Sequence, residues 1–226
     1  MIFERLKEAL YFWRRHLAAL FLISAPFALL GEAAQWVMGP FLMFDGDQLT
    51  GINLSVGLVM LLIRPLAEGA LIMQLASIHQ GRAQGVIACT LPALMLYPAL
   101  VLTYFLIGIG VTLGWTLLFF PALWVYTRLC FAPFRVVLHR QSPIAALRGA
   151  FQYSGPCQWP LLGAILLTGL IMFGLIGLTN TLFVGLLGES AGVGLVINVL
   201  ASLITTLINV VVFRFWLLND PGTQQT

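Results

Sequence analysis

The sequence contains very few charged residues for its length. Only 8% of its 226 residues are Asp, Glu, Lys or Arg, whereas these residues make up roughly a quarter of a soluble domain. Eight acids and eleven bases cannot cover the surface of a water-soluble fold of this size. Because 60% of the residues are hydrophobic, most of the exterior must face lipid tails. This composition excludes a soluble globular domain.

The motifs of metal centres, nucleotide-binding loops and hydrolases are also missing. Cys89, Cys130 and Cys157 form no closely spaced pair, so neither a disulfide framework nor a zinc site is predicted. The three histidines are isolated, and there is no glycine-rich phosphate loop, nucleophile elbow or carboxylate pair. We therefore expect no catalytic residue, metal, cofactor or nucleic-acid partner, and an enzyme is the weakest of the function classes considered.

Five apolar regions are long enough to cross a bilayer core, which takes about 20 helical residues. They are Leu17 to Met38, Leu54 to Ile78, Ala83 to Thr127, Trp159 to Leu187 and Val193 to Leu218. The first region follows a basic segment and resembles the apolar core of a signal peptide. Because the apolar residues continue through Trp36 and Met38, we interpret this region as an uncleaved span.

The third region must turn back on itself. It has no charged residue, and as one helix at about 1.5 Å per residue it would be more than twice the bilayer thickness. Gly108, Gly110 and Gly114 are the predicted hinge, because glycine gives the backbone freedom that a tight turn requires. The sequence thus predicts an all-α bundle of about six spans in a single membrane domain, residues 1–226.

The distribution of basic residues predicts the orientation. Bases precede the first span, follow the second and lie between the fourth and fifth: Arg5, Lys7, Arg14, Arg15, Arg82, Arg135, Arg140 and Arg148. The opposite loops contain Asp45, Asp47 and Glu189 and no base. Since cytoplasmic loops retain Lys and Arg, we expect both termini in the cytoplasm.

Two segments are predicted to lie on the membrane surface as amphipathic helices. In residues 1–16, apolar side chains recur at helical spacing on one face, ending in the basic pair Arg14 and Arg15. In residues 142–155, Ser142 is a potential N-cap, and Ile144, Leu147 and Phe151 form an apolar stripe beside Arg148. These segments are either plain anchors or binding sites for anionic lipid headgroups through Arg14, Arg15 and Arg148.

The second span carries an ion pair near its middle. Arg64 and Glu68 are one helical turn apart and flank Pro65, about ten residues or ~15 Å from the start of the span. Charges at that depth are costly and usually face the bundle interior. The pair could lock helix packing, or it could bind a substrate or move a proton at a kink made by Pro65.

The last span carries a polar stripe on one face. Asn198, Ser202, Thr205 and Asn209 recur at intervals of four, three and four residues. Such a stripe should avoid lipid, either by bonding to other helices or by lining a wet cavity. We expect Arg64 and Glu68 to form an interior pair near Asn209 or Thr205.

Several short motifs are similar to those of a known family: Phe120 to Leu123, Arg128, Phe131 to Pro133 and Ser142 to Gly149, with weaker likeness at Leu71 to Leu75, Gly81, Arg82 and Phe213 to Phe215. Through these motifs the chain resembles the YciC family of small bacterial inner-membrane proteins. The membrane module of some glycerophosphodiester phosphodiesterases is similar in pattern at greater distance. The resemblance implies six spans in a bacterial inner membrane and transfers no catalytic residue.

These observations leave two main functions open. In the first, the chain binds or senses a membrane-resident molecule, or scaffolds other envelope proteins, without chemical turnover. Alternatively, it is a secondary transporter or channel for a small polar or anionic solute centred on Arg64 and Glu68. A lateral opening between helices favours the first function, and a closed polar cavity that reaches one surface favours the second.

Overall fold

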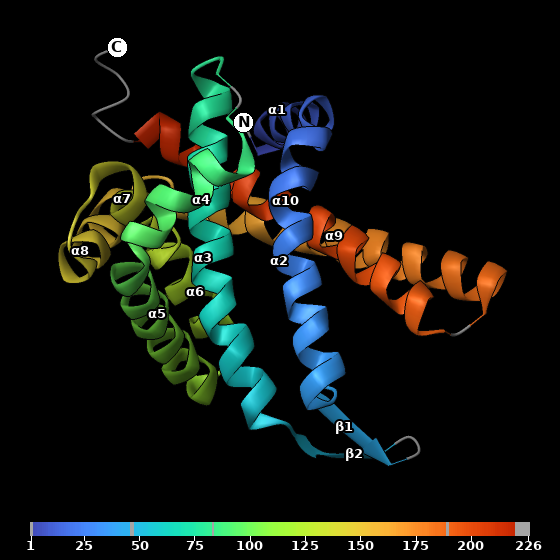
Figure 1. The fold of residues 1–226 in the computed structure, drawn as a ribbon. Helices are drawn as coiled ribbons and strands as arrows, with labels where there is room; N and C mark the ends of the chain where they lie inside the picture. Colours follow the sequence, from blue (N-terminus) through green and yellow to red (C-terminus); the bar gives the residue numbers. More distant parts are fainter. Residues whose placement is uncertain (1, 46–47, 83, 189, 220–226) are drawn as a thin grey trace.

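The computed structural model describes residues 2–45, 48–82, 84–188 and 190–219, which form a bundle of helices with one short hairpin (Figure 1). Asp47, Glu189 and Thr226 lie outside the described residues. The helices are α1 (Ile2–Arg15), α2 (Leu17–Met38), α3 (Leu54–His79), α4 (Val86–Met95), α5 (Tyr97–Leu117), α6 (Phe119–Leu129), α7 (Ala132–His139), α8 (Pro143–Tyr153), α9 (Gln158–Leu187) and α10 (Ala191–Asn219).

Five of these helices are long and apolar enough to cross a membrane: α2, α3, α5, α9 and α10. Each lies in one of the five apolar regions of the sequence, with bounds that extend at most two residues beyond it, because a long apolar segment in lipid satisfies its backbone by forming a continuous helix. The predicted all-α class is confirmed, and the chain is a multi-pass membrane protein. α6 and α7 run from Phe119 to His139 with only Cys130 and Phe131 between them.

The third apolar region turns, but the predicted glycine hinge is wrong. α5 continues through Gly108, Gly110 and Gly114 and ends at Leu117. Leu118 is extended, its N–H donates to the carbonyl of Gly114 over 3.1 Å, and α6 begins at the next residue. Glycine does not end a helix where no water can replace the lost hydrogen bonds. The turn instead lies at Leu118, and Pro121 falls in the first turn of α6, where proline is tolerated.

A two-stranded hairpin joins α2 to α3, where only a loop was expected. β1 (Leu42–Asp45) pairs antiparallel with β2 (Gln48–Ile52), and the register shifts after Met43. Asn53 ties the hairpin to both helices: its side-chain amide donates to the carbonyl of Met38 over 2.7 Å, and its Oδ1 accepts from the N–H of Val56 over 3.4 Å. One side chain thereby caps the start of α3 and anchors the end of α2.

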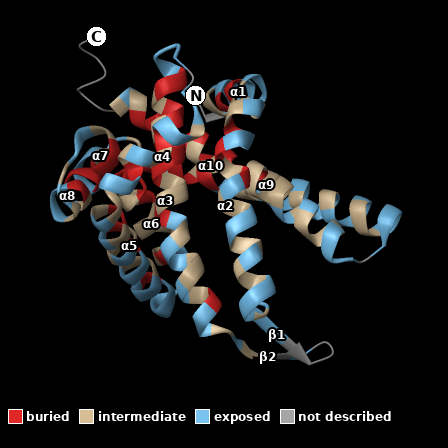
Figure 2. Cartoon of the chain, viewed as in Figure 1, coloured by how far each residue is buried: buried red, intermediate tan, exposed pale blue. Residues whose placement is uncertain are grey.

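The buried core lies toward one end of the bundle, around α1, α3, α7 and the second half of α10 (Figure 2). Its aromatic centre consists of Phe134, Phe213 and Trp216, which are stacked with ring centroids 6.0–6.1 Å apart. The far half of the α9–α10 hairpin extends away from this core (Figure 1), and its apolar side chains are exposed, Phe173 by 78%. Such a surface requires a lipid environment.

The first segment predicted to be amphipathic forms a helix, α1, that packs on the bundle. Ala9 and Phe12 are buried, and the indole N–H of Trp13 donates to Thr206 Oγ1 over 3.0 Å and to the carbonyl of Leu203 over 3.3 Å. α1 is therefore docked on α10 and is more than a helix lying on lipid.

The second segment predicted to be amphipathic forms α8, which packs on the bundle through its small residues. Its buried residues are Ala146, Gly149 and Ala150, whereas Ile144 and Phe151 are 67% and 45% exposed. The small residues allow close approach to α7: a Cβ on Gly149 would lie 2.5 Å from Nε of an arginine on that helix, Arg135. Ser142 occupies the N-cap position without making a side-chain capping bond. Two residues of the predicted apolar stripe, Ile144 and Phe151, therefore lie on the outer surface, whereas Leu147 is partly buried against the core.

Candidate functional site

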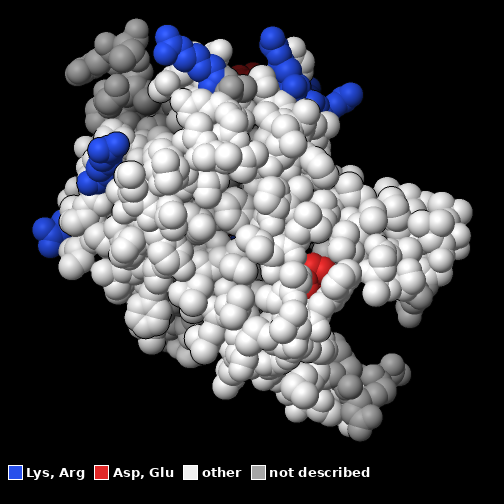
Figure 3. Space-filling view, viewed as in Figure 1, with Lys and Arg blue, Asp and Glu red and all other residues white. Residues whose placement is uncertain are grey.

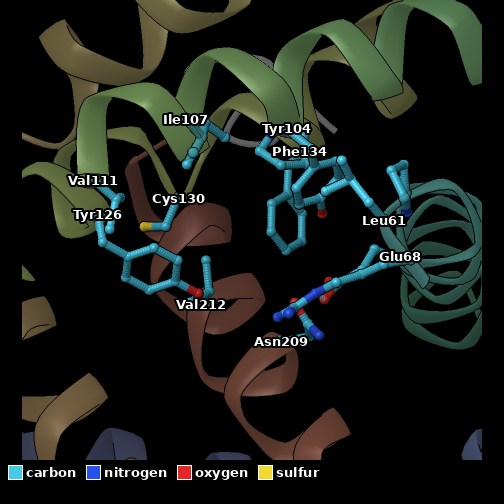
Figure 4. Close-up of a pocket in the computed structure, with 14 residues that line it drawn as sticks. Leu61, Glu68, Tyr104, Ile107, Val111, Tyr126, Cys130, Phe134, Asn209 and Val212 are labelled. Atoms are coloured by element: carbon cyan, nitrogen blue, oxygen red, sulfur yellow. Dashed lines mark ion pairs between the residues drawn. The ribbon is translucent and has the colours of Figure 1, made fainter. Parts of the chain in front are cut away.

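A cavity of about 250 Å³ lies among α3, α5, α6, α7 and α10 (Figure 4). α3 contributes the two charged groups of its lining, α5 and α6 contribute tyrosines, and α10 contributes an amide. The lining residues are Leu61, Arg64, Pro65, Glu68, Tyr104, Ile107, Gly108, Val111, Tyr126, Cys130, Pro133, Phe134, Asn209 and Val212. The lining of the cavity is therefore mostly apolar and includes a few polar groups, as is typical of ligand sites.

Arg64 and Glu68 form the predicted ion pair, but the prediction that both are buried is wrong. Arg64 Nε lies 3.7 Å from Glu68 Oε1. The side chain of Glu68 is only 19% exposed, whereas that of Arg64 is 75% exposed. The pair thus occupies an open cavity rather than a packed interface. Because a contact at this distance is loose, much of the hydrogen-bonding capacity of the guanidinium remains available.

α3 is continuous across Pro65, so the helix is not interrupted at the position where a kink was predicted. Pro65 itself is buried and lines the cavity. Nearby, the hydroxyl of Tyr97 donates to the carbonyl of Leu62 over 2.9 Å, which joins the start of α5 to the middle of α3. The contact fixes α3 relative to α5 close to the charged pair.

Two tyrosines complete the polar part of the cavity. Tyr104 and Tyr126 both interact electrostatically with Glu68 and Arg64. Figure 4 shows Glu68 and Asn209 together on one side of the cavity and Tyr126 on the other. The sequence analysis did not identify these tyrosines, since no local pattern relates residues on α5 and α6 to an ion pair on α3.

The polar stripe of α10 does not act as one unit. Asn209 reaches the cavity, as expected for a neighbour of the ion pair. Ser202 and Thr205 donate to carbonyls of their own helix, each over 2.7 Å. The stripe is therefore neither a continuous interhelical network nor a cavity lining along its whole length. Ser and Thr satisfy their hydroxyls within a helix without needing a neighbour.

The fourth member of the stripe, Asn198, contacts a residue that the sequence analysis overlooked. Its side-chain amide donates to Glu32 Oε2 of α2 over 2.7 Å. A signal for Glu32 was available, because an acid inside a predicted span is a candidate functional residue by default. This bond joins α2 to α10 away from the cavity lining.

The bases predicted to meet lipid headgroups are on the surface. Arg14 and Arg15 are exposed at the end of α1, and Arg148 is exposed on α8. Figure 3 shows the Lys and Arg side chains of one face along the end that carries α1 and along the side that carries α8, with none near the hairpin. Within the described ranges, no three His, Cys, Asp or Glu side chains are grouped closely enough to hold a metal ion.

The fold and the cavity define a multi-pass α-helical membrane protein in which a few polar groups line an open cavity between the helices. No family model, curated protein or solved structure matches the chain. Its function must therefore be argued from the site itself.

Proposed function

We propose that the protein binds an amphipathic, membrane-resident molecule whose anionic polar group enters the cavity beside Arg64, without chemical turnover. The observation that carries this proposal is the state of Arg64: a guanidinium on a membrane-spanning helix that lines a cavity, is 75% exposed and has only a loose contact with Glu68. An intramembrane cation is costly and needs a partner, and an anionic ligand would provide one.

The other lining residues support a ligand that is mainly apolar. Ile107, Val111 and Phe134 offer contact for a hydrocarbon part. Tyr104, Tyr126 and Asn209 can donate to an oxygen-rich headgroup. The combination of one accessible cation, several neutral donors and apolar walls matches an amphiphile better than a small hydrated solute.

The remaining parts of the proposal concern the membrane. We propose six spans, with α6 and α7 together making the fourth, and both termini in the cytoplasm of a bacterium whose inner membrane holds the protein. The loop asymmetry and the resemblance to the YciC family support this arrangement. Exposed Arg14, Arg15 and Arg148 are proposed to contact anionic headgroups.

The test compares what is bound by wild-type protein and by matched arginine variants. Each protein is purified in mild detergent, and its retained amphiphiles are counted by native mass spectrometry. Arg64→Gln should reduce retention about tenfold or more, since a hydrogen bond to a charged group is lost. Arg64→Lys should preserve part of the amphiphile retention, because lysine keeps the positive charge. Arg82→Gln is the control, because Arg82 is exposed and does not line the cavity.

Equal retention by wild type and Arg64→Gln would refute binding at this cavity. Proteoliposomes provide the second measurement, which separates binding from transport. If Arg64→Gln abolishes the flux of a small anion across the vesicle while wild-type protein retains no amphiphile, the transporter replaces the proposed function. If a pull-down recovers an envelope protein, and neither amphiphile retention nor anion flux depends on Arg64, a scaffolding function replaces the proposed binding function.

A further inference from the structure

A second pocket lies at the end of the bundle that carries α1. It measures about 230 Å³ and is formed by three helices: Arg5 and Glu8 from α1, His79 from the end of α3, and Arg214, Leu217 and Leu218 from α10. None of these residues lines the cavity at Arg64. Four of its six lining residues have ionisable side chains, so it suits a compact anionic group such as a phosphate.

Arg214 lacks the partners that a half-buried arginine normally has. Its Nε is buried and makes no hydrogen bond, and Arg214 forms no ion pair with any residue that the structure describes. Its guanidinium carbon lies 4.7 Å from the centre of the Phe12 ring, which holds the group in place. A buried donor without an acceptor is unfavourable, and an anion held in the pocket by the rest of the guanidinium would offset part of this cost.

The charges around this pocket do not balance. Among the residues that the structure describes, Glu8 is the only acid in the lining, and it already accepts from Arg5 Nη1 over 2.8 Å. Arg214 is repelled by Arg5 and attracted by Glu8. Arg214 also acts electrostatically on His16 and His79. The lining therefore has an excess of positive charge that an anion would neutralise.

The surroundings of the pocket favour an anion held at a membrane surface. Leu217 and Leu218 form an apolar part of the lining. α1 carries Phe3 and Tyr11 exposed beside its charged residues, which is the pattern of a helix at a lipid interface. Basic pockets between helices at this level are where phosphate-bearing headgroups bind.

We infer that Arg5 and Arg214, assisted by His79, form a binding site for a phosphate-bearing anion, separate from the cavity at Arg64. The phosphate comes from an anionic lipid headgroup or from free phosphate in solution. The site does not depend on the proposed function, because it shares no residue with that cavity.

The test is a titration of the full-length protein with phosphatidylglycerol or phosphatidylcholine, followed by native mass spectrometry. Phosphatidylglycerol should bind more tightly. Arg214→Gln and Arg5→Gln should each weaken its binding about fivefold, the amount that one base contributes near a membrane surface. Glu8→Gln should strengthen binding, because it frees Arg5 from its ion pair. Arg140→Gln is the control, since Arg140 is exposed and lies outside the pocket.

Competition with sodium phosphate, at an ionic strength matched with sodium chloride, identifies the source of the anion. Displacement of the lipid shows that free phosphate fits the site, and persistence of the lipid assigns the site to a headgroup. Equal losses in Arg140→Gln and Arg214→Gln would overturn the inference, because bulk electrostatic attraction would then explain the binding. The absence of both lipid preference and phosphate binding would also overturn it. If Arg214→Gln does not fold, Arg5→Gln and Glu8→Gln decide the result by their opposite signs.

Discussion

Replacing Gly114 with alanine should separate α5 from α6, and the structure gives the size of the effect. A Cβ at this position would lie 2.7 Å from Cα and 2.8 Å from N of Ala122, and 3.0 Å from the carbonyl carbon of Pro121. All three are backbone atoms, so no side-chain rotation can relieve the contact. The helices must move apart, and such overpacking typically costs about 1–3 kcal/mol.

Gly108 provides a matched control in the same helix. A Cβ there would meet nothing within 4 Å, so Gly108→Ala keeps only the gain in helix propensity, which is up to about 1 kcal/mol. The same gain applies to Gly114→Ala. The difference in unfolding free energy between the two variants therefore isolates the overpacking cost, about 1–3 kcal/mol.

The assay is reversible unfolding in mixed micelles, followed by far-ultraviolet circular dichroism. Gly108→Ala should be at least as stable as wild type, and Gly114→Ala should be less stable than Gly108→Ala. Tyr126 lies one helical turn after Ala122 and lines the cavity, so retention of the amphiphile should also fall in Gly114→Ala. Equal stability of the two variants would refute the close approach of α5 and α6.

Three further predictions concern charge. Arg64→Leu should destabilise more than Arg64→Leu with Glu68→Leu, but by no more than about 1 kcal/mol in micelle unfolding, because Arg64 is mostly exposed; a difference of several kcal/mol would indicate a packed pair. Burial, with smaller effects of neighbouring arginines, lowers the pKa of His16 in the folded protein. The stability that neutral His16 contributes is therefore present above its unfolded pKa of about 6.5 and is lost as pH falls through the lower folded pKa. Wild type should lose more stability than His16→Gln between pH 8 and pH 5, and equal losses would contradict this. A reporter fused after Thr226 should act in the cytoplasm and one inserted at Asp47 outside, and the reverse pattern would refute the proposed orientation.

The sequence by itself determined the spans, the spacing of the charged pair and the amphipathic first helix. α2, α3, α9 and α10 follow from apolar length alone, since lipid leaves no other way to satisfy a long apolar backbone. The contact of Arg64 with Glu68 follows from one turn of helix. These features depend only on neighbours along the chain, so local patterns were sufficient to predict them.

Contacts between distant segments were decided only by the tertiary structure. The turn at Leu118, rather than at the glycines, follows from the docking of α6 on α5 through Gly114. α8 turns its small residues inward because Gly149 fits beside Arg135, a contact that the spacing of apolar residues along the chain does not predict.

The cavity has the same origin. The side chain of Arg64 is exposed rather than buried, and Tyr126 lines the same cavity from a different helix. The hydrophobic effect, which sorts residues in water, does not sort one apolar helix face from another in lipid. Close packing and a few polar contacts choose the interfaces between helices, and they depend on shapes that appear only when the helices meet.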